Sequence, residues 1–238
     1  MRAGFWRNKC VHRIAILGAE NILMDSDSKT IYGKDSVKNY ISTPSAIVFP
    51  KNESHVLLLV EWANKTKTHL VPSGGRTGYS GGAVACNHEV VVSFEKMNHI
   101  LDYNPEDQTV RCQSGVITKT LQNFAEEKHL YYPVDFASSG SSQIGGNIAT
   151  NAGGIKVIRY GSTRNWIYGL NVVTGNGDLL KLNQGLVKNS TGYDLRHLFI
   201  GSEGTLGIIT EATVKLTKPP TESIAQWNFG FNLPLYLA

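Results

Sequence analysis

The stretch of residues 72–82, Pro-Ser-Gly-Gly-Arg-Thr-Gly-Tyr-Ser-Gly-Gly, restricts the fold of this chain more than any other. Glycine adopts positive φ easily and lets a ligand approach the backbone closely. Successive N–H groups in such a loop can converge into a concavity that binds anions. Side-chain donors suited to phosphate oxygens lie between the glycines: Ser73, Arg76, Thr77 and Ser80. Taken alone, the stretch fits a phosphate-binding loop and a flexible glycine-rich loop about equally well.

The segments around this loop predict a small α/β lobe. Residues 46–49, 69–71 and 90–92 are short apolar runs with the composition of strands. Residues 53–65 carry apolar side chains at helical spacing. The strand–helix–strand order favours a parallel sheet with right-handed connections. The glycine loop would then follow the carboxyl end of a strand, where α/β sheets usually bind ligands.

A second lobe is expected from about residue 105. Residues 108–113 alternate as a strand does, and residues 116–129 place apolar side chains on one helical face. Further strands are predicted over residues 170–174, 179–182, 208–210 and 212–216. The pair Asn176-Gly177 between the first two of these is typical of a hairpin with a primed turn.

Composition and charge exclude several classes of protein. The chain has 238 residues, of which 41% are hydrophobic and 18% charged, and its formal net charge is +4, as expected for a globular protein. No basic block with interleaved aromatic residues occurs, so nucleic acid is not expected as a partner. The longest strictly apolar run, residues 56–60, is too short to span a bilayer. Cys10, Cys86 and Cys112 lack metal-ligand spacing and fit a reducing, cytoplasmic setting.

Several familiar site patterns are missing from the chain. There is no Gly-x-Gly-x-x-Gly fingerprint, no Walker A loop, no His-Glu-x-x-His and no Cys-x-x-Cys. No metal site is therefore predicted, and the seven scattered histidines are more typical of structural residues than of catalysts. What remains is three separated loops rich in Gly, Ser, Thr and Asn, over residues 72–82, 133–140 and 144–154. Together they favour a long ligand with phosphates and a polar ring system, such as a dinucleotide cofactor.

These loops and the motifs after them resemble the FAD domain of FAD-linked oxidases. The matching stretches are residues 72–82, 133–140, 144–154, 159–161, 188–195 and 201–210. Within that superfamily the chain is most similar to the D-2-hydroxyacid dehydrogenases, which include D-lactate and D-2-hydroxyglutarate dehydrogenases and glycolate oxidase subunits. The resemblance runs in order from about Leu17 to Pro220. Enolpyruvyl-glucosamine reductases share the fold, but the stretches 159–161 and 188–195 disfavour them.

The resemblance implies an α+β fold of two lobes, the PCMH or vanillyl-alcohol-oxidase type, with FAD held between them. The FAD domain would span residues 41–220. It would consist of a small α/β lobe, 41–104, and a larger lobe, 105–220, with a mainly antiparallel sheet flanked by helices. Residues 1–40 would be a lead-in, whose basic start fits either a transit peptide or a first helix. Residues 221–238 form an aromatic tail that no longer resembles the family.

The resemblance also assigns contacts to the cofactor. The pyrophosphate would be held by Pro72, Ser73, Gly74, Gly75, Arg76, Thr77, Gly78, Ser80, Gly81 and Gly82. The flavin and its ribityl chain would lie along Ser138, Ser139, Gly140, Ser142, Gly145, Gly146, Asn147, Thr150 and Ala152. The flavin or the adenosine end would be enclosed by Gly161, Glu203, Gly204, Ile208 and Ile209. The last two fit an ordinary core strand equally well.

Some members of the superfamily attach FAD to a histidine or cysteine in the first loop. Residues 72–82 contain neither, so non-covalent FAD is predicted. The expected reaction is oxidation of a small D-2-hydroxy acid to the 2-oxo acid, with an electron acceptor that the sequence does not identify. No catalytic residue is assigned.

The family's substrate or cap domain has no counterpart in this sequence. We therefore expect either a truncated or degenerate chain, or a second chain that supplies the cap. A module that binds FAD without turnover is the alternative function.

Overall fold

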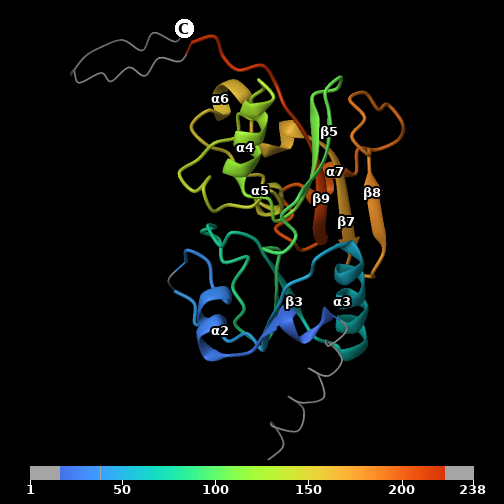
Figure 1. The fold of residues 1–238 in the computed structure, drawn as a ribbon. Coiled ribbons are helices and arrows are strands. Elements are labelled where there is room, and N and C mark those ends of the chain that lie inside the picture. The colour runs from blue at the N-terminus through green and yellow to red at the C-terminus, as the bar shows by residue number, and fades with distance from the viewer. Residues whose placement is uncertain (1–16, 38, 223–238) are drawn as a thin grey trace, which may run out of the picture.

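A computed structural model describes residues 17–37 and 39–222, which form two lobes, one above the other in Figure 1. The first lobe is built on a four-stranded sheet with the order β1-β2-β4-β3. The second lobe is built on a five-stranded sheet with the order β5-β6-β9-β7-β8. The basic start of the chain, and all but the first two residues of the aromatic tail, lie outside the described residues.

The first lobe contains the strand–helix–strand unit that the sequence predicts. Its elements are a 3-10 turn (Ala19–Asn21), β1 (Ile22–Leu23), α2 (Ser26–Tyr32), β2 (Ala46–Val48), α3 (Glu53–Thr66), β3 (Leu70–Ser73) and β4 (Val90–Ser93). Strands β2, β4 and β3 run parallel, and β1 adds an antiparallel edge. Helix α3 starts where the Asn52 side chain accepts a hydrogen bond from the His55 N–H, and it ends at Lys67 in the left-handed conformation. The predicted parallel sheet and helix are therefore confirmed.

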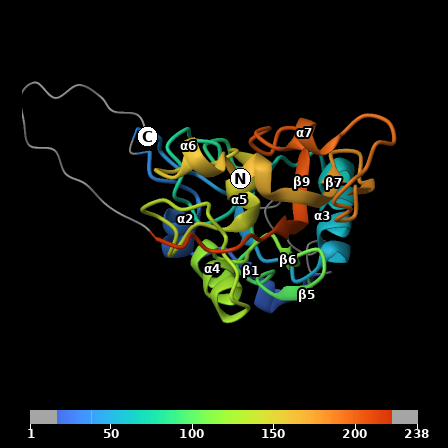
Figure 2. The ribbon, with the colours of Figure 1, turned by 90° about the horizontal axis from the view of Figure 1, so that it is seen from above.

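The second lobe is an antiparallel sheet with helices packed on one face (Figures 1 and 2). Its strands are β5 (Ile100–Asn104), β6 (Thr109–Gln113), β7 (Ile167–Thr174), β8 (Leu179–Leu182) and β9 (Gly207–Lys215). Its helices are α4 (Thr118–Glu127), α5 (Ile144–Ala149), α6 (Val157–Tyr160), a 3-10 turn (Thr163–Trp166) and α7 (Arg196–Phe199). Residues of α4 and α5 share a core with β6, β7 and β9. Val173 and Ile208 instead join the core around α3, which connects the two lobes.

Three local features differ from the sequence-based expectation. The strands predicted over 208–210 and 212–216 form the single strand β9. The sequence predicts a loop over 144–154, but its first part forms helix α5, because Ile144 and Ile148 lie one turn apart and both are fully buried. The hairpin of β7 and β8 is confirmed, but its turn is not primed. The loop consists of residues 175–177, and only Gly177 takes positive φ in it. The Gly177 N–H donates a hydrogen bond to the Thr174 carbonyl.

Two carboxylates mark the contact between the lobes. Glu53 begins α3 and accepts a hydrogen bond of 2.8 Å from the Thr210 hydroxyl, while Glu211 follows Thr210 on β9. Burial, and secondly the charge of Glu53, raise the pKa of the Glu211 carboxyl. Asn171 donates to Glu211 at 3.1 Å, and Arg111 lies 3.4 Å from the same oxygen, but these contacts do not cancel the increase in pKa.

We expect Glu211→Gln to stabilise the chain at neutral pH. A carboxyl whose pKa is raised in the folded state stabilises the fold fully at pH values below its unfolded-state pKa, about 4.3. This contribution to the free energy of unfolding is lost as the pH rises through the folded-state pKa. In thermal melts, E211Q should raise Tm by roughly 2–4 °C at pH 7 and leave it nearly unchanged at pH 4. The exposed control E106Q should change Tm at neither pH. A lower Tm for E211Q at pH 7 would show that the Arg111 ion pair outweighs burial.

Candidate cofactor site

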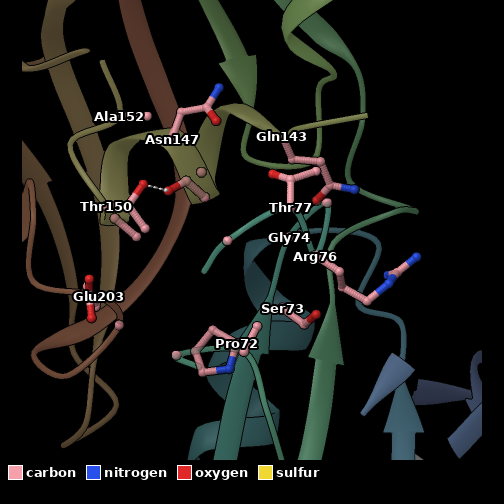
Figure 3. Close-up of a pocket in the computed structure, with 18 of the residues that line it drawn as sticks. Pro72, Ser73, Gly74, Arg76, Thr77, Gln143, Asn147, Thr150, Ala152 and Glu203 are labelled. Carbon is pink, nitrogen blue, oxygen red and sulfur yellow. Dashed lines mark hydrogen bonds between the residues drawn. The ribbon is translucent and has the colours of Figure 1, made fainter. Parts of the chain in front are cut away.

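A cavity of about 330 Å³ lies between the two lobes. The first lobe contributes the glycine loop that follows β3, so the loop emerges at the carboxyl end of a parallel strand as predicted. The second lobe contributes α5, the turn after it and the start of β9. Figure 3 shows Thr150 and Glu203 on one side of the cavity and Thr77 and Arg76 on the other, with Ser73 and Pro72 below.

The cavity brings most of the predicted contact residues together. Those on its wall are Pro72, Ser73, Gly74, Gly75, Arg76, Thr77, Gly78, Ser80, Gly82, Ser138, Gly145, Gly146, Asn147, Thr150, Ala152, Glu203, Gly204, Ile208 and Ile209. Those that do not line it are Gly81, Ser139, Gly140, Ser142 and Gly161. The wall is therefore assembled from all three of the loops that the sequence predicts to bind a ligand.

The predicted residues outside the wall include several with structural tasks. The Ser142 hydroxyl is buried and lies 2.8 Å from the Thr118 hydroxyl. Gly161 ends α6 with φ +74°, and a Cβ there would approach Asn165 Oδ1 to 2.3 Å. Gly81 takes φ +80° and donates its N–H to the Asp35 carboxylate at 3.0 Å. These three residues shape the loops rather than face the cavity.

The glycines of the wall fall into two kinds. A Cβ at Gly75 would lie 2.1 Å from the Ser141 carbonyl oxygen, and one at Gly145 would lie 2.6 Å from the Ser114 Cβ. By contrast, a Cβ at Gly146 would meet no atom closer than 4.0 Å. Some of the glycines are thus required because the two loops pack against each other, whereas Gly146 leaves bare backbone beside open space.

Several polar atoms of the wall are buried without a hydrogen-bond partner. They are Ser73 Oγ, Arg76 NH1, Ser114 Oγ and Gln143 Oε1. Buried polar groups in proteins are nearly always paired, and leaving one unpaired costs about 1–3 kcal/mol. Unpaired hydroxyl, amide and guanidinium groups beside bare backbone fit a ligand with phosphates, hydroxyls and a polar ring. The residues present therefore fit FAD.

Residues 35 and 36, before β2, make hydrogen bonds to the glycine loop. Ser36 donates its N–H to the Gly78 carbonyl at 3.1 Å and its hydroxyl to the Arg76 carbonyl at 3.3 Å. Asp35 accepts from the Gly81 N–H through one oxygen and from the Val37 N–H, at 2.8 Å, through the other. Residues that are predicted only as a lead-in thus hold the loop in shape.

Arg76 is held in an unusual position at the centre of the loop. Its φ of +57° is rare for a residue with a side chain. Its guanidinium lies 3.1 Å from the Glu95 carboxylate and stacks 4.5 Å from the centre of the Tyr32 ring. The Tyr32 hydroxyl donates to the other Glu95 oxygen at 2.8 Å, and burial followed by this contact raises the pKa of Tyr32. One guanidinium nitrogen is thereby anchored while NH1 stays unpaired.

Other residues of the wall were not predicted from the sequence. They are Asp35, Tyr79, Ala83, Phe94, Ser114, Phe136, Gln143, Ala149, Gly153 and Gly207. Tyr79, Gln143 and Ala149 sit inside or beside the recognised motifs, so a wider reading of those motifs would have included them. Asp35, Phe94 and Ser114 reach the cavity only through the tertiary fold, and no local signal points to them.

The ionisable side chains that line the cavity in the described part of the chain are Asp35, Arg76, Tyr79 and Glu203. No group of three or more His, Cys, Asp or Glu side chains placed to hold a metal ion is found among the described residues. Across residues 17–37 and 39–222, every helix is too short or too polar to cross a membrane.

Solved structures of other proteins share this fold. Alkyldihydroxyacetonephosphate synthase matches with a TM-score of 0.80 at 25% identity, covering 90% of this chain and 41% of that one. The p-cresol methylhydroxylase structure matches with a TM-score of 0.76 at 24% identity, covering 93% and 45%. The predicted α+β fold of the PCMH type is therefore confirmed.

Sequence relatives show the family. The D-2-hydroxyglutarate dehydrogenase of Stutzerimonas stutzeri is 64% identical over 204 residues, which is 86% of this chain and 44% of that protein. The glycolate oxidase subunit GlcD of Bacillus subtilis is 39% identical over 207 residues, 87% of this chain and 44% of the relative. The chain thus spans less than half the length of these relatives. The family described as "FAD binding domain" matches residues 44–183, and the chain belongs to this FAD-binding family.

Proposed function

We propose that this chain holds FAD non-covalently between its two lobes and forms the cofactor-binding part of an oxidoreductase for a small D-2-hydroxy acid. The observation that carries the proposal is the set of unpaired buried polar atoms on a cavity wall built from both lobes. The 64% identity to a D-2-hydroxyglutarate dehydrogenase supports the substrate class. Residues 41–220 would be the FAD domain. The predicted division into lobes 41–104 and 105–220 lies one strand too late, because β5 (Ile100–Asn104) pairs with β6 in the sheet of the second lobe.

The chain's own residues would bind and orient the cofactor. The backbone N–H groups of residues 74–80, with that of Gly82 and the Ser73 hydroxyl, would hold the pyrophosphate, since nests and hydroxyl donors suit phosphate oxygens. Asn147 and the bare backbone at Gly146 would lie along the flavin. Bound FAD supplies hydride acceptance from the α-carbon of the hydroxy acid, which leaves the 2-oxo acid. The family's cap domain, on the same or a second chain, would supply the substrate contacts and the base.

Non-covalent attachment is the part of this proposal with the simplest test. The described cavity wall contains no histidine and no cysteine to which a flavin could be joined. Denaturing the purified protein should therefore release the yellow chromophore into the supernatant after precipitation. Colour that stays with the polypeptide would contradict non-covalent binding.

A module that binds FAD without turnover is the second candidate. It is considered because no catalytic residue is assigned among the residues that line the cavity. The test is to add D-2-hydroxyglutarate or D-lactate to the FAD-loaded chain without oxygen and to follow flavin absorbance. Bleaching supports catalysis by the chain itself, whereas stable colour supports the module.

We expect Arg76→Ala to weaken FAD binding about tenfold, equivalent to about 1.4 kcal/mol. The variant would lose the charge-assisted contact between Arg76 NH1 and a phosphate of FAD. It would also lose the ion pair that joins the loop to Glu95. Because the lost contact is ionic, the salt dependence of the dissociation constant should also decrease. Titrations of flavin fluorescence at several salt concentrations measure both quantities. The surface control R159A should match the wild type, and an R76A affinity equal to the wild type would remove Arg76 from the site.

A further inference from the structure

Gln143 stands at the start of α5 with a side chain that has no structural partner. It is the N-cap residue of that helix, yet its side chain makes no capping hydrogen bond. The residue is 5% exposed, and its Oε1 atom is buried without a donor. Its backbone is fixed, because its carbonyl accepts the Asn147 N–H at 2.9 Å and its strand-like position bridges to Ile117. An amide oxygen on a fixed backbone is thus left unpaired on the cavity wall.

The surroundings of this amide come from both lobes. A Cβ at Gly74 would lie 3.7 Å from Gln143 Oε1 and 3.5 Å from the Gly146 Cα, so the glycine loop passes directly across it (Figure 3). Ser114, 2% exposed, lies against Gly145 of the same helix, and its hydroxyl is also buried without a partner. Two unpaired polar groups therefore lie close to the place where the loops meet.

The unpaired oxygen of Gln143 indicates which kind of ligand group can bind there. The Gln143 oxygen can only accept, so it needs a hydroxyl or N–H donor. A pyrophosphate has no such donor at neutral pH, whereas the ribityl chain, the ribose, the flavin N3–H and the adenine amino group do. Building on the proposed function, we propose that Gln143 accepts a hydrogen bond from a hydroxyl or N–H group of FAD, with the Ser114 hydroxyl as a second contact.

The test compares apoprotein stability with FAD affinity in the wild type and four variants. Gln143→Leu removes an atom without a protein partner, so the apoprotein should keep its Tm while FAD binding weakens about tenfold. Gln143→Glu keeps an acceptor oxygen and should bind FAD more tightly than Q143L. Ser114→Ala should weaken binding by a smaller factor with an unchanged apoprotein Tm.

Gln122→Leu is the matched control. Gln122 is also buried, but its amide donates to the Val134 carbonyl at 3.0 Å. Its loss should lower the apoprotein Tm, which Q143L should not do.

The possible outcomes separate the role of Gln143 from FAD binding itself. A wild-type chain that does not bind FAD removes the proposed function. A wild-type chain that binds FAD together with an unchanged Q143L affinity overturns only the role of Gln143. An apoprotein Tm of Q143L that falls as far as that of Q122L assigns the residue a structural role and overturns the inference. If Q143E binds FAD more weakly than Q143L, the added carboxylate lies beside a phosphate of FAD. That result overturns the assignment of Gln143 as an acceptor.

Discussion

Replacing Gly75 with alanine is expected to remove most FAD binding and to destabilise the chain. The added Cβ would lie 2.1 Å from the Ser141 carbonyl oxygen, which is backbone and cannot rotate away. Overpacking of this kind costs about 1–3 kcal/mol, which corresponds to a fall in Tm of roughly 2–12 °C for a chain of this size. The clash is removed only if the loop of residues 72–82 moves away from the loop that contains Ser141, and this movement would widen the cavity between them. FAD affinity should therefore fall about a hundredfold, about 2.8 kcal/mol.

Gly140→Ala is the matched control for this substitution. Gly140 precedes Ser141 in the loop that Gly75 packs against, but it does not line the cavity. It has no atom within 4 Å of its would-be Cβ and does not take positive φ. G140A should therefore keep both Tm and FAD affinity, as measured by thermal melting and fluorescence titration. A G75A chain that melts and binds FAD like G140A would show that the loops do not pack as described.

Thr118→Val is expected to have the next largest effect, although Thr118 does not line the cavity. Its hydroxyl accepts from the Asn147 amide at 2.7 Å and lies 2.8 Å from the Ser142 hydroxyl, in a fully buried position. Valine has the same shape but no hydroxyl, so the Asn147 amide loses its partner inside the protein. Leaving such groups unpaired costs about 1–3 kcal/mol, and Tm should fall by roughly 2–12 °C.

The conservative substitution Thr118→Ser distinguishes the lost hydroxyl from lost packing. T118S keeps the hydrogen bonds and should recover most of the Tm that T118V loses. FAD affinity should fall in T118V as well, because Asn147 is a predicted contact to the flavin and Thr118 fixes its side chain. Equal Tm values for T118V and the wild type would mean that the buried network contributes nothing to stability.

The parts of the fold that could be predicted from sequence are those with a local cause. Helix α3 follows from the apolar spacing of residues 53–65, and the glycine loop follows directly from strand β3. The composition of that loop is by itself compatible with a phosphate ligand, because bare N–H groups and hydroxyls occur together. The position of this loop beside residues 133–140 and 144–154 depends on the tertiary fold. Composition alone could not predict that position.

The parts that could not be predicted depend on long-range contacts. Asp35 reaches Gly81 from a segment 46 positions earlier, and no pattern joins the two. Glycine composition could not separate Gly75, which is required by packing, from Gly146, which leaves open space. Helix α5 is not evident from the sequence because two glycines lower its local propensity, whereas burial of Ile144 and Ile148 stabilises it.

The flavin content of the purified chain tests FAD binding most directly. The chain should elute as a yellow protein, or take up added FAD in a saturable one-to-one titration. Denaturation should then release the flavin, and mass spectrometry should identify it as intact FAD. A correctly folded chain that stays colourless and does not bind added FAD would contradict the proposal that this chain holds the cofactor.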